Sequence, residues 1–320
     1  MANDDRLAPK TIKIPDFIIC GAMKSGTTTL HGMLNQHPDV FIPEKELHFF
    51  DRDNIIQHPD FNQFSGGQWS SHQPKDYWAW YNQQFSLANP QQLVGEDSTT
   101  YLASPLAAKR IALQHKAIKL VIMLRQPSRR AFSQYWHLVR SNRMPYRFED
   151  CIKLNPHSVL NRSLYTLQIQ QYLKYIPREN IHFVIFEEFI ADKAKVLKGV
   201  CEHIGVDDKK LPATAINLHE NATTYPKFYA LQLLKNSLFP QAGNINYDQH
   251  FEHSLSHKIK FRNTIYRLIN GVHRKINPLV TKKPKEMEVA TKEFLDKYFI
   301  NELEGLNELI GRDVLSLWFD

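Results

Sequence analysis

The stretch Phe17-Ile18-Ile19-Cys20-Gly21-Ala22-Met23-Lys24-Ser25-Gly26-Thr27-Thr28-Thr29 decides the fold of this chain. It begins as an apolar run, turns through two glycines around a lysine, and continues into apolar residues at helical spacing. This order predicts a strand, a tight turn and a helix. A helix N-terminus exposes unpaired N–H groups and the positive end of the helix dipole, so the turn is a candidate anion site. The alternative is an ordinary strand–turn–helix with a solvated lysine.

The turn departs from the nucleoside-triphosphate loop, whose pattern is G-x-x-x-x-G-K-[ST]. Gly21 and Gly26 have the right separation, but Thr27 stands where the lysine belongs, and the lysine is Lys24. The sequence also lacks a convincing apolar strand ending in an aspartate that holds magnesium. These departures favour a phosphate cradle that works without a metal. They suit sulfuryl transfer, because a sulfo group carries less negative charge than a phosphoryl group and needs less electrostatic help.

Size and composition indicate a soluble globular α/β chain. Its 320 residues, 42% hydrophobic and 23% charged, suffice for one sizeable core. The net charge of +7 favours anionic ligands, although a solvated basic surface is the alternative and no block of like charges resembles a nucleic-acid tail. The three cysteines have neither a disulfide framework nor metal-ligand spacing. Without a signal peptide or a long apolar span, we expect a cytoplasmic protein with no membrane span.

Short apolar runs alternate with helical patterns from Pro15 onward, which predicts a central parallel sheet flanked by helices. We expect residues 1–14 to be a flexible N-terminus and residues 15–320 to form a single domain with a helical C-terminal part. The predicted strands are Phe17–Cys20, Val40–Ile42, Leu93–Gly95, Lys119–Leu124 and Ile181–Phe186. The predicted helices are Thr27–Gln36, Tyr77–Phe85, Pro105–Gln114, Arg129–Arg140, Leu164–Tyr175, Lys193–His203, Tyr225–Leu238, Lys258–Ile276 and Val289–Ile310. Residues 51–75 and Asn277–Pro284 are predicted loops, the latter basic.

A second cluster, Lys45-Glu46-Leu47-His48-Phe49-Phe50-Asp51, gathers a lysine, two carboxylates and an imidazole. The alternation of a strand would place Glu46 and His48 on the same side. A glutamate beside a lysine and a histidine in aromatic surroundings is a candidate general base. A partly exposed strand with a local ion pair is the alternative.

A third cluster follows the apolar run Leu120–Leu124, which delivers Arg125 at its C-terminal end. Ligands of open α/β sheets bind at that edge. An arginine fork together with the hydroxyl of Ser133, eight residues later, suits a phosphate monoester. The alternatives are a salt bridge from Arg125, for instance to Asp97, and an ordinary helix residue at Ser133.

Taken together, the three clusters resemble the sulfotransferases that use PAPS (3′-phosphoadenosine-5′-phosphosulfate). The resemblance is greatest to the heparan sulfate glucosaminyl 3-O- and N-sulfotransferases and their soluble bacterial relatives. It spans most of the chain from Pro15 onward and includes the stretch Tyr172–Ile181 and the ending Leu309-Ile310-Gly311-Arg312-Asp313 with Trp318. The motifs are specific as a set, although each is weaker alone.

The resemblance implies a role for each cluster. Lys24 would contact the sulfonate and assist departure of the bisphosphate, and Glu46 would take the acceptor's proton, with His48 as the alternative base. The lysine loop, through Ser25, Gly26, Thr27, Thr28 and Thr29, would hold the 5′-phosphate. Arg125 and Ser133 would hold the 3′-phosphate. The family's basic stretch before the last helix is replaced by Thr281-Lys282-Lys283-Pro284, so Lys282 and Lys283 are candidates for a further phosphate contact.

The acceptor is less defined, and a small molecule, a lipid or a glycan all suit the resemblance. Heparan-specific members have Glu-Lys-[Ser/Thr]-Pro after the second long strand, where this chain has Glu96-Asp97-Ser98-Thr99. An aspartate in place of that lysine disfavours a densely sulfated acceptor, so we expect a neutral or weakly charged one. The rival interpretations are a nucleotide-dependent kinase, a nucleotide-binding protein without catalysis and, more weakly, a nucleic-acid binder. The oligomeric state is not predicted.

Overall fold

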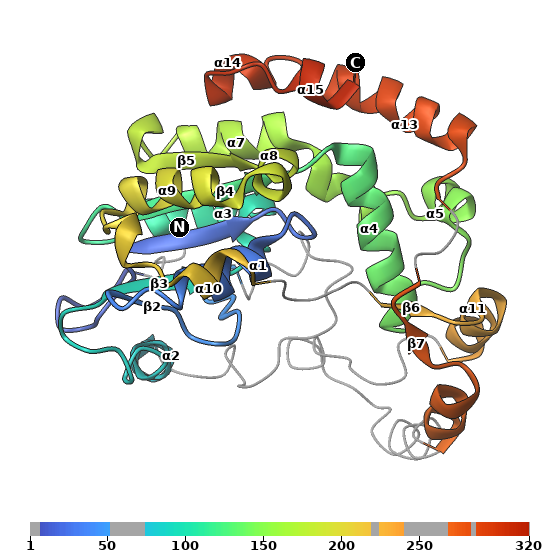
Figure 1. Ribbon diagram of the computed structural model, residues 1–320, viewed down its shortest axis with the longest axis horizontal. Coiled ribbons are helices and arrows are strands. Elements are labelled where there is room, and N and C mark those ends of the chain that lie inside the picture. The colour runs from blue at the N-terminus through green and yellow to red at the C-terminus, as the bar shows by residue number, and fades with distance from the viewer. Residues whose placement is uncertain (1–6, 52–73, 219–223, 240–267, 283–285, 320) are drawn as a thin grey trace.

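The computed structural model in Figure 1 describes residues 7–51, 74–218, 224–239, 268–282 and 286–319. Its centre is a five-stranded, wholly parallel sheet in the order β2-β3-β1-β4-β5. The strands are β1 Phe17–Gly21, β2 Val40–Phe41, β3 Leu93–Asp97, β4 Lys119–Leu124 and β5 Ile181–Ile185. The predicted fold class is therefore confirmed, and each predicted strand exists to within a residue or two at its ends.

The central strands are apolar without alternation because helices cover both faces of the sheet. Every residue of β1 is buried, and so are the last five of β4. β3 contributes Gly95 opposite Phe17 of β1, and a methyl group added at Gly95 would lie 2.3 Å from the Phe17 ring. Only glycine allows this ring to pack flat on the neighbouring strand.

Two layers of helices enclose the sheet (Figure 1). On one face pack α1 Thr27–Leu34 and α9 Lys193–Ile204, through Leu30, Met33, Leu197 and Val200. On the other pack α3 Pro105–Ala112 and α7 Tyr165–Leu173. Over α7 lies the C-terminal part, α13 Val289–Glu302, α14 Leu306–Ile310 and α15 Leu315–Phe319.

The long helix α4 Pro127–Arg140 leaves the C-terminal edge of the sheet after β4. Pro127 occupies its first turn, and the Gln126 side chain accepts a hydrogen bond of 2.7 Å from the Arg129 N–H, so the helix begins two residues earlier than predicted. Around α4 lie α5 Phe148–Leu154, α6 His157–Leu160, α11 Tyr229–Leu238 and the two-stranded sheet of β6 Tyr225–Pro226 and β7 Leu279–Val280. The remaining helices are α2 Pro74–Gln83, α8 Phe186–Ala191 and α10 Ala213–Ile216.

Several predicted boundaries were wrong. Tyr225 does not begin a helix, because Tyr225–Pro226 pairs with Leu279–Val280 from the segment predicted as a basic loop. The last helix is not continuous from Val289 to Ile310. Its chain turns at Gly305, whose φ of 78° is costly for a residue with a side chain. Residues 268–276 of the helix predicted at Lys258–Ile276 are helical, and the others lie outside the described residues, as does nearly all of the loop predicted at 51–75.

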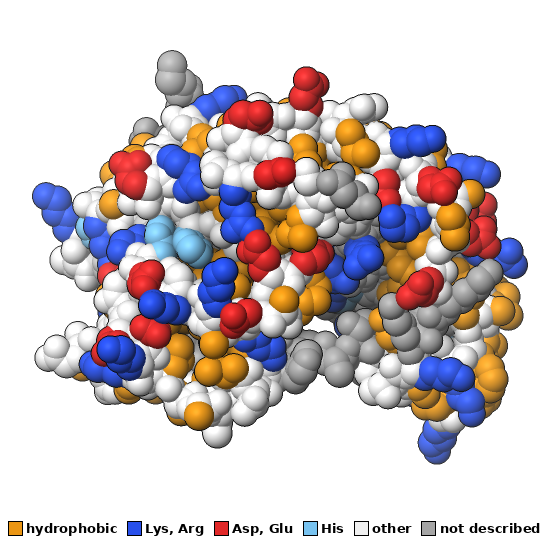
Figure 2. Space-filling model, turned by 45° about the horizontal axis from the view of Figure 1, so that its top comes forward, with side chains coloured by type: hydrophobic (Ala, Val, Ile, Leu, Met, Phe, Trp, Pro, Cys, Tyr) orange, Lys and Arg blue, Asp and Glu red, His pale blue; other side chains and the backbone are white. Residues whose placement is uncertain are grey.

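The N-terminal segment contacts the body of the protein from residue 8 onward. The Ala8 N–H donates a hydrogen bond of 3.1 Å to Gln114 Oε1, and Ile14 is buried in the core. This packing corrects the expectation of a flexible segment over residues 8–14. Among the described helices, none has the length and apolar character needed to cross a bilayer. On the face drawn in Figure 2, Lys and Arg side chains are interspersed with Asp and Glu, so the positive charge there forms no single block.

Candidate active site

The turn between β1 and α1 folds as a cradle at the C-terminal edge of the sheet. Lys24 has a φ of 67° and Gly26 a φ of 91°, so the turn uses left-handed backbone at two positions. Gly26 is the N-cap of α1, and no side chain caps the helix there. The N–H groups of Thr27 and Thr28 therefore lie at a helix start with no intrahelical acceptor, the arrangement that favours an anion.

Ser25 adds an unsatisfied hydroxyl to this cradle. Its side chain is buried, and its Oγ has no hydrogen-bond partner among the described residues. Buried polar groups are normally paired, so an isolated hydroxyl in a helix-start loop points to a missing ligand. The exposed Thr28 and the buried Thr27 and Thr29 follow on α1, so the structure brings together every loop residue that the sequence predicted.

Arg125 lies directly against the lysine loop. Its Nη1 donates a hydrogen bond of 2.9 Å to the Lys24 carbonyl, and its guanidinium lies 4.5 Å from the centroid of the Phe186 ring. Its Nε is buried without a hydrogen-bond partner in the described part of the chain. The Tyr165 hydroxyl donates to the Arg125 carbonyl at 2.9 Å, which fixes the backbone. Burial lowers the pKa of Arg125 from its usual value, and an anion at the free Nε would offset that loss of hydration.

The alternative of a salt bridge between Arg125 and Asp97 is wrong, because the two side chains have other partners. Asp97 is buried and its Oδ2 lies 3.3 Å from His31 Nδ1 on α1. Burial raises the pKa of Asp97 to about 6, with Glu46 adding to the effect. The guanidinium of Arg125 is therefore directed to the loop and to Phe186 instead of to a carboxylate.

Glu46 lies in the segment that follows β2. Its Oε2 accepts hydrogen bonds from the Thr99 N–H at 3.0 Å and from the Thr99 hydroxyl at 2.8 Å. Oε2 also lies 3.5 Å from His48 Nε2, while His48 Nδ1 lies 2.9 Å from Thr100 Oγ1. Glu46 and His48 are thus neighbours as predicted. They do not stand on a strand, because residues 45–51 form bends and turns and His48 has a φ of 50°.

Lys24 is close enough to Glu46 and to two arginines for their charges to affect its pKa. The pKa of the Lys24 ammonium is lowered to about 8, mainly by burial and also by Arg140 and Arg125, whereas Glu46 acts in the opposite direction. At neutral pH most Lys24 side chains therefore remain protonated beside the carboxylate. A carboxylate that accepts protons and an ammonium that stabilises a departing anion are the two groups that a metal-independent transfer needs.

A basic stripe on the last turn of α4 and the residues directly after it interacts electrostatically with Lys24, and it was not predicted from the sequence. His137, Arg140 and Arg143 recur at a spacing of three residues, with Arg143 Nη2 2.7 Å from His137 Nε2. Burial, together with Lys24 and the two arginines, lowers the pKa of His137 to about 2, so its ring is neutral. The spacing of three to four residues from Ser133 to His137, Arg140 and Arg143 is the sequence pattern that could have predicted this stripe.

The other predicted phosphate ligands are less well placed. Ser133 is half-buried on α4, and its hydroxyl has no hydrogen bond to a described residue. Lys282 is exposed after β7, and no hydrogen bond or ion pair joins it to the described residues, so its phosphate contact stays a prediction. Lys283 lies outside the described residues. No group of three His, Cys, Asp or Glu side chains suited to a metal occurs among the residues that were searched, which are the described ones.

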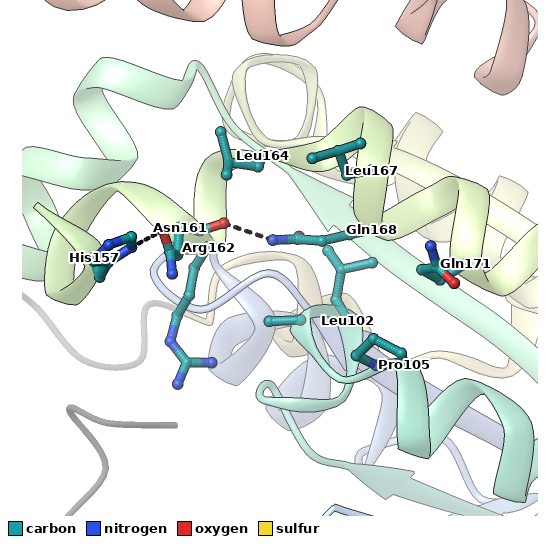
Figure 3. Close-up of a pocket in the computed structure, with 10 residues that line it drawn as sticks. Leu102, Pro105, His157, Asn161, Arg162, Leu164, Leu167, Gln168 and Gln171 are labelled. Atoms are coloured by element: carbon teal, nitrogen blue, oxygen red, sulfur yellow. Dashed lines mark hydrogen bonds between the residues drawn. The ribbon is translucent and has the colours of Figure 1, made fainter. Parts of the chain in front are cut away.

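A separate cavity of about 320 Å³ lies behind the Tyr101–Ala103 turn (Figure 3). The Leu102 side chain forms part of its lining, and a methyl group added at Gly21 would lie 3.3 Å from Leu102 Cβ. The opposite wall comes from α6 and α7, where Gln168 Nε2 donates to the Asn161 carbonyl at 2.7 Å. The cavity thus adjoins the start of the lysine loop through one leucine side chain.

Known proteins have sequences similar to that of this chain. The model of the sulfotransferase family matches residues 15–210, more than half of the chain. The heparan sulfate glucosamine 3-O-sulfotransferase 5 of Mus musculus is 30% identical over 231 residues, 69% of this chain and 60% of that protein. The 3-O-sulfotransferase 3B1 of Mus musculus is 27% identical over 61% of this chain and 47% of its own length. The chain therefore spans about 60% or less of these curated relatives.

Among solved structures, a sulfotransferase from Alicyclobacillus acidocaldarius superposes with a TM-score of 0.62 at 26% identity. The superposition covers 96% of this chain and 99% of that one. The similarity extends beyond the sheet to the C-terminal helices, which lie outside the residues matched by the family model.

Proposed function

Because the chain belongs to the sulfotransferase family, we propose that it moves the sulfuryl group of PAPS to a hydroxyl or an amine of an acceptor. The single observation that carries the proposal is the uncapped N-terminus of α1 at the lysine loop, beside the buried Ser25 hydroxyl and the buried Arg125 Nε, neither of which has a hydrogen-bond partner among the described residues. The resemblance recognised in the sequence as that of the PAPS-dependent family is confirmed at the level of the family.

The residues of the cradle fit a doubly phosphorylated adenosine. The N–H groups of Gly26, Thr27 and Thr28 and the Ser25 hydroxyl would hold the 5′-phosphate, since no side chain caps this helix start and the Ser25 hydroxyl has no hydrogen-bond partner among the described residues. The free Nε of Arg125, with Ser133, would hold the 3′-phosphate. PAPS supplies the activated sulfuryl group when it is bound.

Glu46 is arranged as the base. Thr99 donates two hydrogen bonds to Oε2, which fix the carboxylate, and no described residue engages Oε1 through a hydrogen bond. As the acceptor oxygen or nitrogen forms its bond to sulfur, its proton passes to Glu46, and the bond between sulfur and the phosphate oxygen breaks. The Lys24 ammonium stabilises the negative charge that appears on the departing phosphate.

Two substitutions separate the roles. We expect Lys24→Ala and Glu46→Ala each to lower turnover by at least about 100-fold, the scale of a lost charge stabiliser or general base. Only Lys24→Ala should also weaken binding of adenosine 3′,5′-bisphosphate in calorimetric titration. Near-normal turnover of Glu46→Ala would transfer the role of base to His48, and a wild-type chain without affinity for the bisphosphate would contradict the proposed function.

For the acceptor we propose a neutral or weakly charged molecule, which includes small alcohols, lipids and glycans. Asp97 lies close enough to Glu46 for the two charges to interact, so a sulfated acceptor would approach two carboxylates. A panel of neutral glycosides, phenols and heparan-type chains with labelled PAPS tests this. Preference for the sulfated polymer would reject it and would make Arg140 of α4 and Arg143, three residues after the helix, the candidate contacts.

A further inference from the structure

A buried carboxylate at the end of β3 is connected to the candidate base through two hydroxyl groups. Glu96 is fully buried, and its Oε1 accepts hydrogen bonds from Ser98 Oγ at 2.7 Å and from the Tyr101 hydroxyl at 2.5 Å. Its Oε2 accepts from the Tyr81 hydroxyl. Burial and the neighbouring carboxylate raise the pKa values of both tyrosines, so both remain protonated donors.

The two hydroxyls on Oε1 also accept hydrogen bonds from the segment that carries Glu46 and His48. The His48 N–H donates to Ser98 Oγ at 2.9 Å, and the Phe50 N–H donates to the Tyr101 hydroxyl at 3.0 Å. A hydroxyl has one proton, and donation of that proton to Glu96 leaves its lone pairs for the backbone N–H groups. The orientation of both hydroxyls is therefore set by a single carboxylate oxygen.

These hydrogen bonds hold a segment that contains a left-handed residue, His48. His48 has a φ of 50°, which a non-glycine residue adopts only when its surroundings hold it there. The N–H of the same residue is bound to Ser98, and its ring contacts Glu46 and Thr100. A loss of the Ser98 contact would let residues 46–48 relax toward ordinary dihedral angles and would move the Glu46 carboxylate.

We propose that Glu96 is a positioning residue, which through Ser98 and Tyr101 holds the backbone at His48 and Phe50 and thereby the Glu46 carboxylate. The inference rests on the proposed function for its effect on turnover. Its structural part, the ordering of residues 46–51 by the two hydroxyls, stands independently of any reaction.

The chain offers a matched control for the test. Tyr81→Phe removes the third hydroxyl donor to Glu96, on the oxygen that contacts neither Ser98 nor Tyr101, and keeps the ring that stacks on Phe49 at 4.1 Å. Ser98→Ala and Tyr101→Phe each remove one of the two connecting hydroxyls. All three variants remove one donor from the same buried carboxylate, but only Ser98→Ala and Tyr101→Phe also remove the acceptor of a backbone N–H, that of His48 or Phe50, so the control isolates this second effect.

Three measurements are made on each full-length variant. Hydrogen–deuterium exchange reports the N–H groups of residues 46–51, calorimetry reports the affinity for adenosine 3′,5′-bisphosphate, and labelled PAPS with the best acceptor of the panel reports kcat. We expect Ser98→Ala and Tyr101→Phe to speed exchange in residues 46–51 and to lower kcat at least tenfold, with bisphosphate affinity within about twofold of the wild type. Tyr81→Phe should keep both exchange and kcat close to the wild type.

The inference is overturned if kcat and exchange are unchanged in the two variants, or if all three variants lose kcat in proportion to their loss of thermal stability. A wild-type chain that neither binds the bisphosphate nor transfers sulfate rejects the proposed function instead. In that case the exchange rates of residues 46–51 still decide whether the two hydroxyls hold the segment.

Discussion

Replacement of Gly26 by alanine tests how the lysine loop and Arg125 cooperate. Gly26 has a φ of 91°, a conformation that costs a residue with a Cβ about 1–2 kcal/mol. The new methyl carbon would also lie 3.0 Å from Phe186 Cδ2 and 3.1 Å from Cε2, so the ring must shift by a few tenths of an ångström. That ring is the surface on which the Arg125 guanidinium stacks.

The expected effect on ligand binding follows from these contacts. A disturbed cation–π contact is worth roughly 1 kcal/mol, and a weakened charge-assisted hydrogen bond to phosphate about 1.5 kcal/mol. Their sum corresponds to a loss of about 10–100-fold in affinity for adenosine 3′,5′-bisphosphate. We therefore expect Gly26→Ala to lower both the Tm, by a few degrees, and the affinity measured by calorimetry.

Gly205→Ala is the matched control. Gly205 ends α9 with a φ of 93°, nearly that of Gly26, but an added methyl there meets only Lys119 Nζ at 3.8 Å. The backbone strain is the same in both variants, and only one of them displaces Phe186. Equal affinities in the two variants, whether both normal or both reduced, would refute the argument that Phe186 transmits the change to Arg125.

Three further outcomes are expected. Because the Lys24 pKa is about 8 and the protonated form is the active one, kcat/KM for PAPS should fall about tenfold per pH unit above pH 8. Lys24→Arg should move that fall to higher pH, and an unshifted profile would assign it to another group. In the wild type, Asp296 Oδ1 accepts hydrogen bonds from Gln126 Nε2 at 2.9 Å and from Ser128 Oγ at 2.6 Å. Asp296→Ala leaves both donors without this acceptor, so the free energy of unfolding should fall by about 2–3 kcal/mol in denaturant titration. Turnover should be unchanged in EDTA, whereas a loss that Mg²⁺ restores would favour kinase-like chemistry.

The segment that carries Glu46 and His48 marks the limit of prediction from sequence. Its residue types indicated a base, and its alternation suggested a strand, yet the structure has turns there. The partners that give these side chains their geometry, Ser98, Thr99 and Thr100, lie about fifty residues away in the chain. They become neighbours because β3 lies between β2 and β1 in the sheet. Neither residues 45–51 nor residues 98–100 contain a pattern that predicts this strand order.

The sequence by itself determined the buried strands, the lysine turn and the start of α1, because apolar runs, glycine positions and helical spacing act over a few residues. Only the folded chain shows that Asp97 pairs with His31, that Arg140 at the end of α4 interacts with Lys24, and that the buried Glu96 accepts hydrogen bonds from the two hydroxyls that contact the backbone of His48 and Phe50. The physical reason is one of range. Local dihedral preferences are set by neighbours in the chain, whereas burial, pKa and hydrogen-bond partners depend on which distant segments the sheet brings together.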